Sequence, residues 1–178
     1  MRRAVAATLG LALLHAPPAP AADSLEFPVK AAYLLKFAPF VAWPEGAFPS
    51  ADSPFRLCVS GDDPFGPVLE EVASGTAPAG HPVEIVRMQR VDGPSGCHVQ
   101  YISGSAAQPV ADALKRLEGA PVLTVTDASR DARTRGIVHF VVEENRVRFH
   151  IDEEAAARHR LTLSSKLLGI ALSVRTRR

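Results

Sequence analysis

The sequence predicts a single α/β domain in which helices flank a mixed β-sheet. Between residues 55 and 126, short β-prone runs alternate with helix-start signals, the pattern of βαβ units. Two further runs, residues 137–143 and 146–151, alternate apolar and polar side chains and predict a hairpin. Behind an N-terminal export signal, about 156 residues remain, which is the size of one domain.

The first 22 residues have the three parts of a secretory signal peptide. Arg2 and Arg3 form the charged region, residues 4–14 are apolar, and Ala19-Pro20-Ala21 offers small residues for cleavage. We therefore predict a signal peptide over residues 1–22 and the α/β domain over residues 23–178, exported without a membrane anchor.

The charge of the chain gives no sign of a nucleic-acid partner. The chain has 20 basic and 19 acidic residues, and removal of Arg2 and Arg3 leaves 18 against 19. A mixed chain of net charge about −1 lacks the basic footprint on which phosphate-backbone binding depends.

Residues 29–43 form the most apolar stretch of the exported part. Their only charges, Lys30 and Lys36, lie about 240° apart on a helix, so apolar side chains fill nearly every direction between them. This predicts a buried central helix with a kink at Pro39, ended by Trp43-Pro44. Fifteen residues are too few to span a bilayer, which takes about 20.

The elements that follow are predicted in chain order from their periodicity and their flanking turn residues. Residues 55–61, 82–88, 97–103 and 121–126 are strands. Asp62-Asp63-Pro64 starts one helix, and Ser103-Gly104-Ser105 starts another that runs through residue 117. After the hairpin, whose tight polar turn is Glu144-Asn145, come a polar helix at residues 153–159 and an apolar helix at residues 167–174.

The two cysteines, Cys58 and Cys97, both lie in the exported part and show no metal-ligand spacing. In an oxidising compartment an even pair is most simply one disulfide. Closing a loop of about 40 residues stabilises the folded state by about 4 kcal/mol in the chain-entropy model. The alternative is a redox-active pair, but no neighbouring motif lowers a thiol pKa.

Carboxylates at strand ends are the first candidates for chemistry: Asp62, Asp63, Asp127 and the nearby Asp131. Such a group can hold Mg²⁺, but aspartate also caps helices and turns. Because no phosphate-binding loop or lysine completes a site, we favour the capping role and predict no metal.

A hydrolase would combine Ser103 or Ser105 with a histidine and an aspartate. No nucleophile-elbow motif is present, and His98, His139 and His150 alternate with apolar residues on strands, which favours solvent-facing or backbone-bonded roles. The helix start at Gly104-Ser105 is a weak candidate for anion binding. We predict no catalytic residues and no cofactor.

The last candidate is a surface for a partner protein. On strand 146–151 the side chains of Arg146, Arg148 and His150 share one face, and an edge strand at the end of a hairpin can receive another chain. The alternative is that these charges protect the edge from aggregation.

Five blocks in order resemble one family of exported bacterial proteins, the YfiR-like family. They are VKAAYLLKFAPFVAWP, LCVSGDDPFG, CHVQYIS, PVLTVTD and GIVHFVVEENRVRFHIDEEAAARHRLTLSSKLLGIAL, and the resemblance runs from about Pro28 to Leu172. It departs at Pro39, where related sequences carry a polar or basic residue, and in ASRDARTRG after Asp127, which lacks the usual aromatic and paired glycines.

The resemblance implies a non-enzymatic periplasmic α/β domain with a Cys58–Cys97 disulfide. Its best-known members bind the periplasmic part of an inner-membrane diguanylate cyclase and hold it inactive, which lowers cyclic-di-GMP. A homodimer is a further possibility that the resemblance raises. The alternative functions are a periplasmic small-ligand-binding module and, behind it, a hydrolase.

Overall fold

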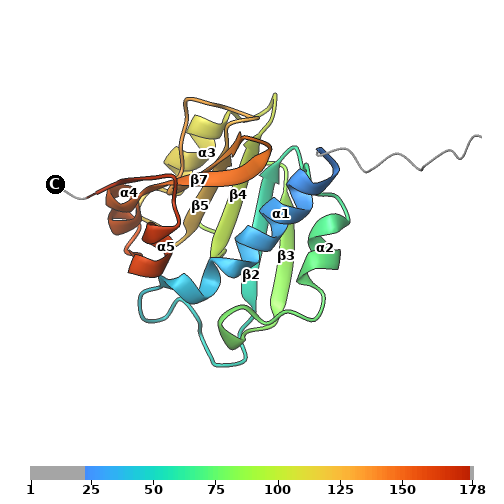
Figure 1. Ribbon diagram of the computed structural model, residues 1–178. Helices are drawn as coiled ribbons and strands as arrows, with labels where there is room; N and C mark the ends of the chain where they lie inside the picture. The colour runs from blue at the N-terminus through green and yellow to red at the C-terminus, as the bar shows by residue number, and fades with distance from the viewer. Residues whose placement is uncertain (1–22, 177–178) are drawn as a thin grey trace, which may run out of the picture.

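A seven-stranded mixed sheet forms the middle of the structure, a computed structural model that describes residues 23–176 (Figure 1). The predicted signal peptide lies outside the described residues. In spatial order the strands are β3 (Val83–Met88), β2 (Phe55–Gly61), β4 (Val99–Gly104), β5 (Leu123–Asp127), β6 (Val138–Glu143), β7 (Arg146–Asp152) and β9 (Ser173–Arg175). A separate two-stranded sheet pairs β1 (Val41–Ala42) with β8 (Thr162–Leu163).

The first five strands of the sheet run parallel, and β7 then reverses direction as the second strand of a hairpin. At its turn, Glu144 and Asn145 have φ angles of 49° and 61°, the left-handed pair that a two-residue hairpin turn requires. The sheet is mixed, as predicted, and each of the predicted strands is present within two residues of its expected bounds.

Helices cover both faces of the sheet. The helices are α1 (Asp23–Lys36), α2 (Val68–Ala73), α3 (Val110–Arg116), α4 (Glu153–Arg158) and α5 (Ser165–Gly169), with short 3₁₀ turns at Ala38–Phe40 and Pro78–Gly80. Buried side chains of α1 and α2 share one core with β2, β4, β5, β6 and β7. Val110, Ala113 and Leu117 form a smaller core on the opposite face, against Cys58 and Ile102.

The predicted central helix is wrong in its bounds and in its surroundings. Helix α1 begins at Asp23 and ends at Lys36, and Pro39 lies in the first turn of a separate 3₁₀ helix instead of kinking a longer one. A proline removes one helical hydrogen bond and clashes with the preceding turn; α1 contains Pro28 but ends before Pro39. The helix packs on one face of the sheet and leaves Val29 40% exposed.

Three later helix predictions also need correction. Helix α2 begins at Val68, not at Asp62, and α3 begins at Val110 and ends at Arg116. The predicted helix at residues 167–174 is divided between α5 and strand β9. Among residues 23–176, no helix combines the length and apolarity needed to cross a membrane.

A buried ion pair ties α1 to the sheet. The Lys30 ammonium lies 2.5 Å from Asp127 Oδ2 at the end of β5 and also contacts the Glu26 carboxylate one turn earlier. Lys30 is 0% exposed and Asp127 2% exposed, so the charges neutralise each other away from water. Burial opposes ionisation of Asp127, but hydrogen bonds from Lys30 and Ser129 outweigh it and hold the pKa of this carboxyl below its ordinary value.

We predict that Lys30→Met destabilises the domain by about 3–5 kcal/mol, because it leaves the Asp127 carboxylate buried without its cation. Adding Asp127→Asn to Lys30→Met should recover part of this loss, since the second change removes the unpaired charge. Urea unfolding followed by circular dichroism measures both. Equal stabilities of Lys30→Met and the wild type would show that the pair does not hold α1 in place.

Candidate functional site

An open groove lies between the start of α1, the β6–β7 hairpin and the segment that follows α5. We call it the β7 groove. It has a volume of about 670 Å³. Its lining residues are Leu25, Glu26, Val29 and Tyr33 of α1, Val142, Asn145, Arg146, Val147 and Arg148 of the hairpin, and Gly169, Ile170 and Ala171.

The β7 groove gathers the apolar surface that the described residues leave uncovered. Four large apolar side chains are exposed there: Leu25 at 58%, Val29 at 40%, Val142 at 47% and Ile170 at 58%, and all four line the groove. Single exposed apolar residues are ordinary on a protein surface, but a gathered set marks an interaction site.

The walls of the β7 groove are set by aromatic packing beneath them. Tyr33 of α1 and Phe37, the first residue after the helix, pack against Phe149 of β7, with ring centroids 5.4 and 5.3 Å apart. These contacts lay the second half of α1 across the hairpin. In the first half of α1, Phe27 packs against Phe65, whereas Leu25 and Val29 remain exposed.

The β7 edge of the groove is positively charged. Arg146 and Arg148 are both exposed and form no ion pair with any described residue. Among the residues whose side chains the structure describes, Glu26 is the only carboxylate that lines the groove, and it contacts Lys30. A molecule bound along the β7 edge of the groove would therefore meet two unpaired arginines next to the apolar lining.

The three residues predicted to contact a partner do not all reach this groove. Arg146 and Arg148 line it, whereas His150 does not. Its Nδ1 lies 2.7 Å from Ser173 Oγ on β9, and its ring lies 6.5 Å from the ring of His139. The expectation that residues 146–151 form an edge strand is wrong for the second half of β7, because β9 pairs with His150, Ile151 and Asp152.

The acidic residues at the strand ends have structural partners. The Asp63 carboxylate accepts from the Phe65 N–H and pairs with Arg87, and the Asp131 carboxylate accepts from the N–H groups of Arg133 and Thr134. Asp127 is held by Lys30. Asp62 is exposed. Within residues 23–176, no three His, Cys, Asp or Glu side chains are grouped as metal ligands would be.

The candidate hydrolase residues are not brought together. The Ser105 hydroxyl accepts from the N–H groups of Ala107 and Gln108, 3.3 Å away in each case, and closes a turn. The Ser103 hydroxyl is buried without a hydrogen-bond partner in the described chain. His98 satisfies backbone groups, accepting from the Arg56 N–H and bonding the Ala47 carbonyl.

The turn at Gly104 explains why α3 begins at Val110 and not at Ser105, as the sequence had predicted. Gly104 has a φ of +72°, and a Cβ there would come within 2.9 Å of a Val110 methyl group. The chain reverses through this glycine, so the Ser103-Gly104-Ser105 signal belongs to a turn, and Pro109 precedes the first residue of the helix.

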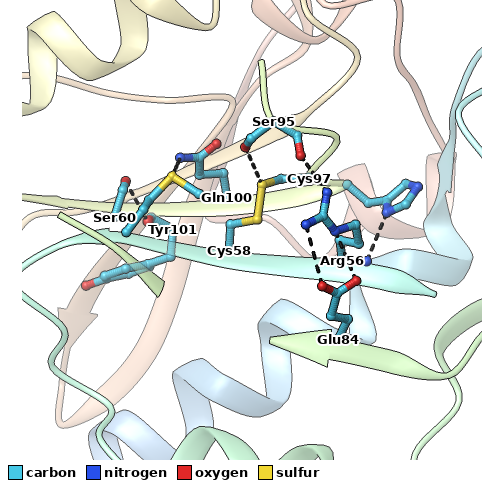
Figure 2. The surroundings of a disulfide bond; sticks show 10 residues. Arg56, Cys58, Ser60, Glu84, Ser95, Cys97, Gln100 and Tyr101 are labelled. Atoms are coloured by element: carbon cyan, nitrogen blue, oxygen red, sulfur yellow. Dashed lines mark hydrogen bonds and ion pairs between the residues drawn. A yellow bond between two sulfur atoms is a disulfide. The ribbon is translucent and has the colours of Figure 1, made fainter. Parts of the chain in front are cut away.

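A disulfide joins Cys58 of β2 to Cys97, two residues before β4, as the sequence led us to expect (Figure 2). The two Cα atoms are 5.9 Å apart. Both cysteines are buried, and Cys58 contributes to the core beneath α3. The bond lies on the sheet face opposite α1, away from the β7 groove, and acts as a link between neighbouring strands.

His139 lies deepest of the histidines on that face. It is 1% exposed, its Nδ1 lies 2.8 Å from Thr126 Oγ1, and its Nε2 has no partner among the described residues. Burial lowers the pKa of His139 to about 4, and the positive charge of Arg135 adds to the effect. Burial also lowers the pKa of His98, His150 and His159.

Comparisons with known proteins identify one family. A family model described as YfiR/HmsC-like matches residues 27–172 of the chain. No curated protein matches the chain.

We predict that the free energy of unfolding decreases as the pH falls from 6.5 toward 4. The unfolded chain binds a proton at His139 near pH 6.5, whereas the folded protein resists it until about pH 4. This difference between the unfolded and folded pKa of His139 corresponds to about 3 kcal/mol in the free energy of unfolding.

Urea titrations at several pH values test this with His139→Gln, which cannot titrate. The variant should show a shallower fall in stability than the wild type, whatever its absolute stability. Parallel curves for the two proteins would contradict the lowered pKa.

Proposed function

We propose that this chain, which belongs to the YfiR/HmsC-like family, is a periplasmic regulator that binds the periplasmic part of an inner-membrane diguanylate cyclase and lowers cyclic-di-GMP. The family match over residues 27–172 supports the regulatory role. The Cys58–Cys97 disulfide fits an oxidising compartment.

The β7 groove is the observation that carries the proposal to particular residues. A regulator that acts by binding needs an accessible surface with apolar area to bury and charges to select its partner. Val142 and Ile170 supply exposed apolar area in the groove, and the unpaired Arg146 and Arg148 supply charge at its β7 edge.

Repression follows from differential binding. A regulator that prefers the inactive conformation of the cyclase shifts the cyclase population toward that state, and only by as much as the two affinities differ. A tenfold preference supplies about 1.4 kcal/mol. The chain therefore needs no chemistry of its own to lower cyclic-di-GMP.

The size of the groove favours a second candidate function. A volume of about 670 Å³ falls within the range of small-molecule sites, so a periplasmic ligand-binding module is the alternative. Metabolite screening by thermal shift distinguishes the two, because a ligand that binds the folded state raises its melting temperature.

We predict that the double variant Arg146→Glu/Arg148→Glu fails to repress the cyclase while remaining folded. Both side chains are exposed and unpaired, so charge reversal should weaken association by about tenfold or more without loss of stability. The matched control is Lys115→Glu/Arg116→Glu on α3, because these two basic residues are also exposed but do not line the β7 groove.

The measurement is cellular cyclic-di-GMP in a deletion strain complemented with each variant. Deletion and the groove variant should give the same raised level, and the control should restore the wild-type level. If deletion leaves cyclic-di-GMP unchanged while a cyclase partner is expressed, the repressor function is wrong and ligand binding becomes the leading function.

A further inference from the structure

The outer edge of β7 is only half occupied. Strand β9 pairs with β7 over His150, Ile151 and Asp152, and the N–H of Leu172 donates to the Phe149 carbonyl at 2.8 Å. Before Phe149, no strand of the described chain pairs with this side of β7. The open half ends at the hairpin turn, beside the β7 groove.

The hairpin geometry shows which backbone groups are free there. In a two-residue hairpin the residues that flank the turn, Glu143 and Arg146, exchange hydrogen bonds. The backbone N–H and C=O groups of successive residues point to alternate sides of a strand. Those of Arg148 therefore also bond toward β6, while those of Val147 and Phe149 point away from β6. The bond from Leu172 to the Phe149 carbonyl agrees with this direction. Val147 therefore directs both its N–H and its C=O to the open edge.

The side chains on the two faces of this edge differ in kind. Val147 and Phe149 face α1 and the apolar lining of the groove, whereas Arg146 and Arg148 project from the opposite face. A strand laid against this edge would have one row of side chains over the apolar groove and the other beside the two arginines.

We propose, resting on the proposed function, that the partner contributes an extended segment that adds to the sheet along Arg146–Arg148, continuing the line of β9. The segment alternates apolar and acidic residues. Its apolar side chains enter the groove between Val29 and Ile170, its carboxylates pair with the arginines, and its backbone bonds the free N–H and C=O of Val147.

Charge argues against a second copy of this chain at the same edge. Pairing β7 with another β7 would place Arg146 and Arg148 beside their counterparts, and like charges on neighbouring strands are destabilising. A homodimer of this protein would have to use another surface.

The test uses two synthetic peptides with the full mature chain: Glu-Val-Glu-Leu-Glu-Val-Glu, and the same peptide with lysine in place of glutamate. Heteronuclear NMR follows the backbone amides. The glutamate peptide should shift the resonances of Arg146, Val147 and Arg148 and slow hydrogen exchange at the Val147 amide, and the lysine peptide should do neither. Equal effects of the two peptides, or no effect of the glutamate peptide at millimolar concentration, would overturn the proposal.

Val147→Pro tests the backbone bond separately from the side chain. Because the Val147 N–H points away from β6, proline removes the outward donor without breaking the hairpin ladder. It should weaken glutamate-peptide binding about tenfold relative to Val147→Ala, which keeps the donor. Equal binding by the two variants would overturn strand addition. If Val147→Pro fails to fold, hydrogen exchange at the wild-type Val147 amide with the glutamate peptide is the deciding test of strand addition.

A cellular arm separates this inference from the proposed function. If deletion raises cyclic-di-GMP but Val147→Pro represses as well as Val147→Ala, strand addition is wrong and the regulatory function stands. If deletion has no effect while a cyclase is expressed, the regulatory function itself is wrong.

Discussion

The position of α1 depends on the buried pair between Lys30 and Asp127. An ion pair withdrawn from water is stable only when each charge is matched, so α1 cannot slide or rotate on the sheet without leaving an uncompensated charge in the core. Tyr101 adds a third group, because its hydroxyl donates to the Asp127 carboxylate at 3.1 Å. Burial and that carboxylate raise the pKa of Tyr101, which keeps it a neutral donor.

The same pair connects the core to the proposed binding surface. Glu26 contacts Lys30 from one turn earlier and also lines the β7 groove. Val29, next to Lys30 in the chain, is therefore directed outward into the groove while Lys30 is directed inward. A substitution that breaks the Lys30–Asp127 pair and displaces α1 should therefore also remove the wall of the β7 groove that α1 forms.

The sheet was largely predictable because its strands are short, apolar and β-branched, and the hairpin because Glu144-Asn145 suits a left-handed turn. The first residues of the helices were harder to predict. Asp63 and Ser105 cap turns with the same hydrogen bonds that they would make at a helix, and the helices begin only after Pro67 and Pro109. Strand β9 was missed because it is only three residues long and follows the apolar residues 167–172, which suit a helix.

The candidate site was predictable only in part. Arg146 and Arg148 alternate visibly along a strand, but Val142 and Ile170 look like core residues until the fold leaves them uncovered. The partner of Lys30 lies 97 residues away in the chain, so no local pattern could name it. The available signal was that Lys30 is one of only two charges in the otherwise apolar residues 29–43.

The proposed contact between the β7 groove and a membrane signalling protein can be tested directly in the cell. The most direct measurement is photo-cross-linking from a photoreactive amino acid placed at Ile170 in the groove, compared with one placed at Arg116 on α3, followed by mass spectrometry of the adducts. We expect the residue at position 170 to capture the periplasmic part of an inner-membrane cyclase, and the residue at position 116 to capture none. Capture of that cyclase from position 116 and not from position 170 would show that the β7 groove is not the binding surface.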